Sequence, residues 1–270
     1  MLIIECVQDL ESSSGTMRVH WFVPNTLPQH PLAQFPGVAV FTEIYQVTGP
    51  VERFCRQIAS NGYVVCCPES YHEFEQPGVV IPYDVEGTER GNKYKIEKEL
   101  SAYDEDATLT LNALEKHPNC NGKLAATGMC LGGHLAFRCA MDPRVKASVC
   151  YFATDIHSET LGKNKQSNSL ARCNEIRGEI LMIFGKQDTH IPPSGRTHIY
   201  SALTKAEVNF SWYELQAQHA FIRDELSKGR YDPAAASNCF HMLLELFFRK
   251  LYVDYGPETV NTQIKIEHVC

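Results

Sequence analysis

Short runs of β-branched and apolar residues alternate along the chain with longer stretches in which apolar residues recur at helical spacing. The short runs predict strands over residues 17–23, 37–42, 63–67, 123–128, 145–153, 179–185 and 208–215. The longer stretches predict helices over residues 50–60, 101–117, 131–141, 195–205 and 234–251. This alternation predicts a mostly parallel central sheet with helices on both faces. Ligands of such sheets bind beyond the carboxyl ends of the strands, so residues that directly follow a strand are candidates for chemistry.

The chain of 270 residues has no repeat, no low-complexity tract and no dividing linker, and 44% of its residues are hydrophobic. These features predict a single domain with a sizeable core. The core is expected over about residues 17–250, with a C-terminal extension over residues 251–270. Residues 68–95 form a predicted loop that is long for a compact domain, and we expect it to border the ligand pocket.

Charge, apolar runs and cysteine spacing exclude several functional classes. The net charge of −7 gives no electrostatic basis for binding nucleic acid or an anionic membrane. No uninterrupted apolar stretch approaches the roughly 20 residues of a membrane-spanning helix, and the acidic N-terminal residues do not resemble a signal peptide. The eleven cysteines lack zinc-ribbon or C-x-x-C spacing. Many lie inside apolar runs, as buried thiols of a reducing compartment do, so we expect a cytoplasmic protein.

The segment Gly128-Met129-Cys130-Leu131-Gly132 lies between a predicted strand and a predicted helix. It matches the nucleophile-elbow pattern G-x-S-x-G with cysteine at the centre. The tight turn needs glycine or a very small residue two positions before and after the nucleophile. It also sets the central side chain at a helix N-terminus, where the dipole and free N–H groups favour a thiolate. The alternative is a buried structural cysteine, but the glycines and the strand–helix context favour a nucleophile at Cys130.

A candidate acid follows a later strand. Asp188 is the first carboxylate after the strand over residues 179–185, in the context G-x-x-D-x-x-x-P. Its alternative roles are an Asx turn or a helix cap. The rival acid is Asp155, after the strand over residues 145–153, but it lacks this context.

A candidate base comes next. His219 lies in the loop beyond the strand over residues 208–215. Other histidines in loops near the predicted mouth of the site are candidates for touching substrate, namely His72, His157 and His190. The order nucleophile, acid, histidine is that of the α/β-hydrolase fold, so we predict this fold with Cys130, Asp188 and His219 as a catalytic triad.

Glu43 stands at the end of the strand over residues 37–42. In this fold the loop at that position supplies one backbone donor of the oxyanion hole, and the residue after the nucleophile supplies the other. These donors are predicted to be the N–H groups of Ile44 and Leu131. A carboxylate beside such a hole is unexpected because it repels a developing oxyanion. By itself, Glu43 is interpreted as a solvated loop acid or a polar anchor.

Five segments together resemble the dienelactone hydrolases, also called carboxymethylenebutenolidases: FTEIYQVTGP, YVVCCPESYH, TGMCLGGHLAF, IFGKQDTHIPP and QHAFIRDE. The resemblance covers about residues 17–250. It implies a Cys-Asp-His triad, which carries over to Cys130, Asp188 and His219. The family also has a glutamate at the position of Glu43, which is thought to pair with the resting thiol and to assist thiolate formation when substrate binds.

The resemblance further implies two arginines that hold a substrate carboxylate. One lies four residues after the histidine, at Arg223. The other lies in the loop after the third predicted strand, where Arg90 is the candidate. Residues 71–93 depart from the bacterial pattern in this loop, and the alternative for Arg90 is a solvated surface arginine.

These residues predict a hydrolase of lactones or activated esters that works through a thioester acyl-enzyme on Cys130. Amides are not expected substrates, because a tetrahedral adduct expels a thiolate when the rival leaving group is poor. No histidine pair has H-E-x-x-H or similar spacing, so neither a metal nor another cofactor is expected. The expected partner is a small-molecule ester or lactone, and the protein is expected to be a monomer or homodimer. The alternative is a non-catalytic or redox-sensing protein with a reactive Cys130 on the same fold.

Overall fold

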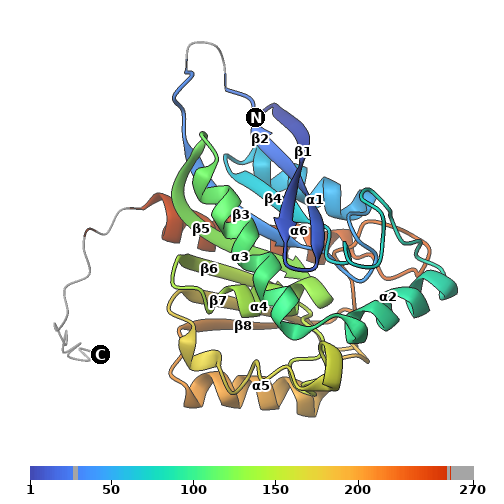
Figure 1. Ribbon diagram of the computed structural model, residues 1–270. Helices are drawn as coiled ribbons and strands as arrows, with labels where there is room; N and C mark the ends of the chain where they lie inside the picture. The colour runs from blue at the N-terminus through green and yellow to red at the C-terminus, as the bar shows by residue number, and fades with distance from the viewer. Residues whose placement is uncertain (27–29, 254–255, 257–270) are drawn as a thin grey trace, which may run out of the picture.

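The computed structural model describes residues 1–26, 30–253 and 256, and one eight-stranded sheet runs through its centre (Figure 1). The strands are β1 (Ile3–Ser12), β2 (Gly15–Pro24), β3 (Phe35–Phe41), β4 (Val64–Pro68), β5 (Cys120–Met129), β6 (Val145–Tyr151), β7 (Glu179–Gly185) and β8 (Phe210–Leu215). They lie in the order β1-β2-β4-β3-β5-β6-β7-β8. β2 pairs antiparallel with β1 and β4, and all the remaining pairs are parallel. The predicted mostly parallel sheet is therefore confirmed.

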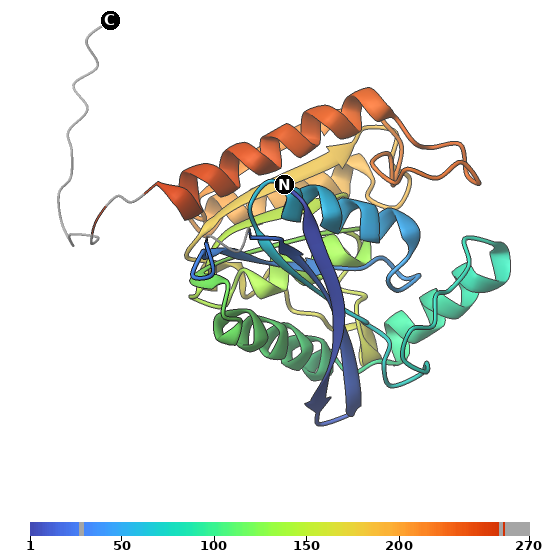
Figure 2. The same cartoon turned by 90° about the horizontal axis from the view of Figure 1, so that it is seen from above.

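Helices cover both faces of this sheet (Figure 2). They are α1 (Gly49–Ser60), α2 (Val85–Glu97), α3 (Leu100–Lys116), α4 (Leu131–Cys139), α5 (Pro193–Lys205) and α6 (Pro233–Phe247), with 3-10 turns at Lys163–Lys165 and Cys173–Glu175 and a π turn at Phe248–Tyr252. α1 and α6 share one face, where the ring of Phe54 meets that of Phe240 at 6.1 Å between centroids. α3 and α4 lie on the opposite face. In residues 1–26, 30–253 and 256, no helix is both long and apolar enough to span a bilayer.

The middle of the sheet forms the core. Every residue of β7 is buried, as is expected of a parallel strand with helices over both faces. The first residue of this strand, Glu179, receives hydrogen bonds from both terminal nitrogens of Arg249, at 2.7 and 2.9 Å. This ion pair ties the π turn after α6 to the amino end of the sheet.

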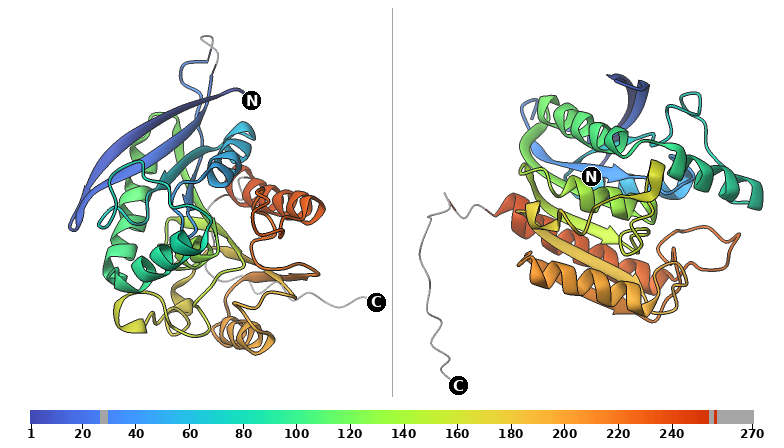
Figure 3. Two further views of the ribbon diagram at one scale, coloured as in Figure 1. Left: turned by 90° about the vertical axis from the view of Figure 1, so that its right-hand side faces the viewer. Right: turned by 60° about the horizontal axis from the view of Figure 1, so that its bottom comes forward.

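Two elements were not predicted. β1 pairs with β2 along its whole length at one edge of the sheet (Figure 3), so the sheet begins before residue 17, although the first buried core residue is Met17. The residues of β1 are mostly exposed, and an exposed edge strand lacks the apolar alternation that indicates a half-buried one. Residues 68–95, predicted as a loop, include most of α2, which projects from the body of the molecule (Figure 2). The predicted extension over residues 251–270 falls largely outside the described residues.

Candidate active site

Cys130 stands in a strained turn between β5 and α4. Its backbone has φ 59° and ψ −119°, a conformation that costs a residue with a side chain about 1–3 kcal/mol. The turn is fixed by the N–H of Cys130, which donates to the carbonyl of Tyr151 at 3.1 Å, and by its carbonyl, which accepts from Thr154 at 3.3 Å. The side chain is only partly buried, at the N-terminus of α4. The surroundings therefore hold the thiol at the carboxyl end of the sheet.

Glycines on both sides make this turn possible. A Cβ on Gly132 would overlap the carbonyl oxygen of Phe41 at the end of β3, and a Cβ on Gly128 would overlap the carbonyl of Gly132. These atoms belong to the backbone and cannot move aside as a flexible side chain does. The spacing G-x-C-x-G thus reflects the close approach of the turn to its neighbouring strand.

Asp188 and His219 meet at the carboxyl ends of β7 and β8. The Nδ1 atom of His219 lies 2.7 Å from the Oδ2 atom of Asp188. The other carboxylate oxygen, Oδ1, accepts from the backbone N–H groups of His190 at 2.7 Å and Ile191 at 3.4 Å. Burial alone would raise the pKa of Asp188, but the hydrogen bond and charge of His219 hold it below its ordinary value.

His219 is buried beside the nucleophile. Burial would lower its pKa, but the charge of Cys130 and hydrogen bonds to Asp188 and Cys130 raise that pKa to about 9. The ring also packs edge-on against Phe152, with 5.0 Å between centroids. His190 lies 4.4 Å from the same ring, and burial together with the charge of His219 lowers the pKa of His190 to about 4. The arrangement favours an imidazolium at His219 opposite a charged Cys130 thiolate, and a neutral ring at His190.

Glu43 is buried and paired with a cation, so its interpretation as a solvated loop acid was wrong. Its carboxylate lies 3.2 and 3.4 Å from the Nη1 atom of Arg223, and the hydroxyl of Tyr83 donates to it at 3.3 Å. The guanidinium of Arg223 in turn lies over the ring of Tyr83, 4.4 Å from the centroid. Within the described part of the chain, the hydrogen-bond partners of the Glu43 carboxylate are therefore Arg223 and Tyr83 and not the Cys130 thiol.

The N–H groups of Ile44 and Leu131 are available as donors. Leu131 is the first residue of α4, so its N–H has no acceptor within the helix. In the described residues, neither N–H group is among the loop and cap hydrogen bonds of the backbone. Ile44 and Cys130 line the same cavity. This arrangement suits an oxyanion hole.

A cavity of about 280 Å³ joins these groups. Cys130, His219, Glu43 and Arg223 all line it. The rest of the wall includes Thr88, Asn92 and Lys95 of α2, Thr154, Asp155, His157 and Ser158 after β6, and His190, Lys228 and Arg230. Residues 68–95 were predicted to border the pocket. This prediction is correct for Thr88, Asn92 and Lys95, although they belong to a helix and not to a loop.

Arg90 does not reach this cavity. It forms an ion pair with Glu75, and its Nε atom lies 3.3 Å from the hydroxyl of Tyr94. The cavity-facing residues of α2 recur every three or four positions, starting at Thr88, whereas Arg90 is only two positions away and therefore lies on another side of the helix. The structure thus contradicts the expected contact of Arg90 with substrate, because the segment is a helix whose phase turns this residue away.

Asp155, the rival acid, is engaged elsewhere. Its carboxylate oxygens lie 2.9 and 3.0 Å from the Nζ atom of Lys95, and Thr160 donates to it at 2.8 Å. Asp188 is the carboxylate that contacts His219.

Sequence analysis missed three basic residues of the cavity wall, namely Lys95, Lys228 and Arg230. Nothing in the spacing of an isolated lysine or arginine marks it as part of a site.

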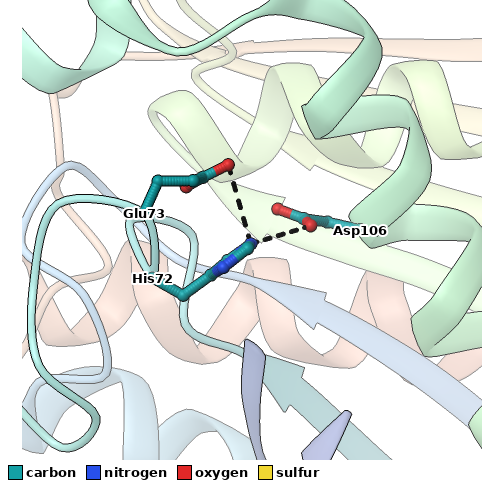
Figure 4. Close-up of side chains that lie close together, drawn as sticks. All are labelled: His72, Glu73 and Asp106. Atoms are coloured by element: carbon teal, nitrogen blue, oxygen red, sulfur yellow. Dashed lines mark hydrogen bonds and ion pairs between the residues drawn. The ribbon is translucent and has the colours of Figure 1, made fainter. Parts of the chain in front are cut away.

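One group of side chains among the described residues has the composition of a metal site: His72, Glu73 and Asp106 (Figure 4). The Nε2 atom of His72 lies 3.0 Å from Asp106 and 3.7 Å from Glu73. The ammonium of Lys98, however, lies 2.5 Å from Glu73 and 2.7 Å from Asp106. It already supplies the cation that these carboxylates need, so the group is a buried salt-bridge network that links α3 to the segment after β4. His72, expected near the mouth of the pocket, belongs to this network and not to the cavity wall.

Comparison with known proteins places these features in a family. The profile of the dienelactone hydrolase family matches residues 25–251. A Saccharomyces cerevisiae protein provisionally named carboxymethylenebutenolidase is 50% identical over 100% of both chains. The carboxymethylenebutenolidase of Pseudomonas putida is 28% identical over 76% of this chain and 83% of its own. A crystal structure from Klebsiella pneumoniae, provisionally named dienelactone hydrolase, covers 92% of this chain and 99% of its own with a TM-score of 0.78 and 22% identity. The predicted resemblance and the predicted α/β-hydrolase fold are confirmed.

Proposed function

The chain belongs to the dienelactone hydrolase family and is a lactone or ester hydrolase, and we propose that it cleaves its substrate through a thioester acyl-enzyme on Cys130. The observation that carries this proposal is the arrangement of Cys130 in a strained elbow beside the Asp188–His219 hydrogen bond of 2.7 Å. A cavity of about 280 Å³ is of a size that suits a small ester or lactone.

In the proposed reaction His219 takes the proton of the Cys130 thiol. The raised pKa of His219, about 9, favours this transfer at neutral pH, and Asp188 fixes the tautomer of the ring. The thiolate attacks the carbonyl carbon of the ester or lactone. The oxyanion accepts hydrogen bonds from the N–H groups of Ile44 and Leu131, each contributing about 3–4 kcal/mol in comparable sites.

The tetrahedral adduct then collapses to the thioester as the carbon–oxygen bond of the leaving group breaks. His219 gives its proton to the departing alkoxide or enolate. It next removes a proton from water as that water attacks the thioester carbonyl. The carbon–sulfur bond then breaks to release the acid product, and His219 returns the proton to the departing Cys130 thiolate. Substrates with good leaving groups suit this sequence, because a poor one would be retained while the thiolate departs.

Glu43 and Arg223 are proposed to couple substrate binding to thiolate formation. In the resting protein they neutralise each other at 3.2 Å. A substrate carboxylate that binds Arg223 would compete with Glu43 for the guanidinium. The displaced carboxylate of Glu43 lines the same cavity as Cys130 and is the alternative acceptor of the thiol proton when His219 is already protonated.

The location and assembly of the protein are part of the same proposal. Most cysteines in the described residues are buried and all ten are free, which suits a reducing compartment such as the cytoplasm. The protein is proposed to be a monomer or a homodimer. Size-exclusion chromatography with light scattering would measure the assembly.

The test of the nucleophile compares the wild type with Cys130→Ala and Cys130→Ser on a panel of activated aryl esters and lactones. We expect the wild type to release aryl alcohol in a burst, and Cys130→Ala to lose at least about 10³-fold in kcat. Cys6→Ala removes an exposed thiol in β1 and serves as the control. Unchanged turnover in both Cys130 variants would exclude this mechanism. Fast alkylation of Cys130 by iodoacetamide without hydrolysis of any substrate would favour the redox-sensing alternative.

A further inference from the structure

The helix α2 packs its own backbone against the residue that carries one of the proposed oxyanion donors. A Cβ built on Gly91 would overlap the carbonyl oxygen of Ile44 and would lie 3.0 Å from the Cβ atom of the same residue. Gly91 is buried inside the helix, and its φ is not positive. The contact with Ile44, and not the backbone conformation, therefore requires a residue without a side chain at this position.

The side chain of Tyr71 ties the same helix to the same loop. Tyr71 is fully buried, and its hydroxyl donates to the carbonyl of Gly91 at 2.9 Å. Its backbone N–H donates to the Oε1 atom of Gln46 at 3.1 Å. Gln46 is held at φ 68°, a left-handed conformation that needs such support in a residue with a side chain. Tyr71 thus joins α2 to residues 43–46, which we call the oxyanion loop.

Further contacts hold α2 at both of its ends. The hydroxyl of Tyr45 in the oxyanion loop lies 2.9 Å from that of Thr88, and its carbonyl accepts from the N–H of Ile81, shortly before the helix, at 3.1 Å. Near the C-terminus of α2, the ammonium of Lys95 lies 2.9 Å from the carboxylate of Asp155. The helix therefore joins the oxyanion loop to the segment after β6.

From these contacts we infer that Gly91 and Tyr71 are positioning residues that set the location of the Ile44 N–H group in the oxyanion hole. The inference rests on the proposed function and adds to it a role for α2. The N–H, the carbonyl and the Cβ of Ile44 share one Cα atom, so a helix that fixes the last two also fixes the first. An oxyanion donor must stand about 2.7–3.1 Å from the developing charge. A small displacement therefore weakens binding of the transition state more than binding of the substrate.

The experiment measures acylation with enzyme in excess over 4-nitrophenyl butyrate. The rate of 4-nitrophenol release gives the acylation rate constant, and its dependence on enzyme concentration gives the half-saturation concentration. We expect Gly91→Ala to lower the rate constant about 10²-fold, as the loss of one oxyanion donor does. Tyr71→Phe removes one hydrogen bond and should lower it about tenfold. The half-saturation concentration should change by less than about threefold in both, because the substrate is still bound.

A second measurement isolates the oxyanion itself. An aryl trifluoromethyl ketone adds reversibly to the Cys130 thiolate: the sulfur lone pair forms the carbon–sulfur bond, and the π pair of the carbonyl moves to the oxygen. The matching trifluoromethyl carbinol binds without this step. Gly91→Ala should weaken inhibition by the ketone about 10²-fold and inhibition by the carbinol less than about threefold.

The matched control is Gly87→Ala, one turn earlier in α2. Gly87 is also buried, but its added Cβ overlaps the carbonyl oxygen of Pro82 and not the oxyanion loop. It should lower stability to urea much as Gly91→Ala does and change the acylation rate constant by less than about threefold. If Gly91→Ala does not fold, Tyr71→Phe decides the question.

Wild-type acylation and ketone inhibition in the folded variants would overturn the positioning role. Equal losses of acylation in Gly87→Ala and Gly91→Ala would overturn it as well, since they indicate a general loss of packing around α2. Turnover that survives in Cys130→Ala would instead overturn the proposed nucleophile. The effect of Gly91→Ala on acylation would still decide the positioning role, because any nucleophile that attacks the carbonyl generates the same oxyanion.

Discussion

The hydrogen bond between Asp188 and His219 gives a sharp prediction for Asp188→Asn. The Oδ1 atom of Asp188 is held by the N–H groups of His190 and Ile191, so the asparagine oxygen should stay at that position. The NH₂ group of asparagine must then face the Nδ1 atom of His219, where Asp188 now presents an acceptor. The amide would donate to Nδ1 and force the proton of a neutral ring onto Nε2. A ring in that tautomer cannot take a proton from Cys130.

The size of the effect follows from the pKa of His219. Its value of about 9, against an ordinary 6.5, corresponds to roughly 3 kcal/mol in favour of the imidazolium. The charge of Cys130 and the hydrogen bond to Asp188 supply this preference against the cost of burial. We expect Asp188→Asn to lower the pKa of His219 and to lower kcat by about 10⁴-fold, as the same change does in a serine-protease triad.

The assay combines turnover of an aryl ester with titration of the His219 ring by NMR. Both should be followed across pH values that bracket the ordinary and the raised pKa of the imidazole. Asp142→Asn, at a carboxylate paired with Arg144 near the amino end of β6, controls for the general loss of one negative charge. If Asp188→Asn left the titration of His219 unmoved while Asp155→Asn abolished turnover, the assignment of the acid would be refuted.

Two further changes test the turn and the packing. Gly132→Ala should lower the unfolding free energy by about 1–3 kcal/mol and abolish most ester hydrolysis, because the added Cβ overlaps the backbone of β3. Gly49→Ala is the control. Its added Cβ meets only the flexible end of Arg53, so it should change the unfolding free energy by less than about 0.5 kcal/mol. Glu179→Gln should lower the unfolding free energy by about 1–3 kcal/mol at neutral pH. Arg249 lowers the pKa of Glu179 in the folded state, so this contribution is present above the ordinary pKa of 4.5 and is lost as the pH falls through the folded value. Urea unfolding at neutral and acidic pH measures it, and a difference that persists in acid would contradict the ion pair.

The parts of the site that the sequence predicts well are those encoded by short, local patterns. The elbow around Cys130 requires small residues at fixed positions because backbone atoms of β3 pass close by, and this requirement is visible as G-x-C-x-G. Asp188 and His219 each follow a buried strand within a few residues. In a parallel sheet, residues that follow different strands converge at one edge, so their proximity could be anticipated without coordinates.

The parts that were missed depend on contacts far apart in the sequence. β1 is mostly exposed, so its hydrogen bonds to β2 define it and its apolar pattern does not. α2 buries only Gly87 and Gly91, which leaves almost no apolar stripe from which to predict a helix. Without the helix, the side on which Arg90 lies could not be derived. The partner of Glu43 was equally hidden, because Arg223 lies 180 residues further along the chain.

The register of the sheet explains why Asp188 and not Asp155 serves His219. β7 and β8 are neighbours, and Gly185 pairs directly with Leu215 at their carboxyl ends. Asp188 lies three residues beyond the first of these and His219 four residues beyond the second, so the two side chains leave the sheet from nearly the same level. Asp155 follows β6, which β7 separates from β8. A substitution that shifted the pairing of β7 with β8 would therefore separate acid from base even if it touched neither residue.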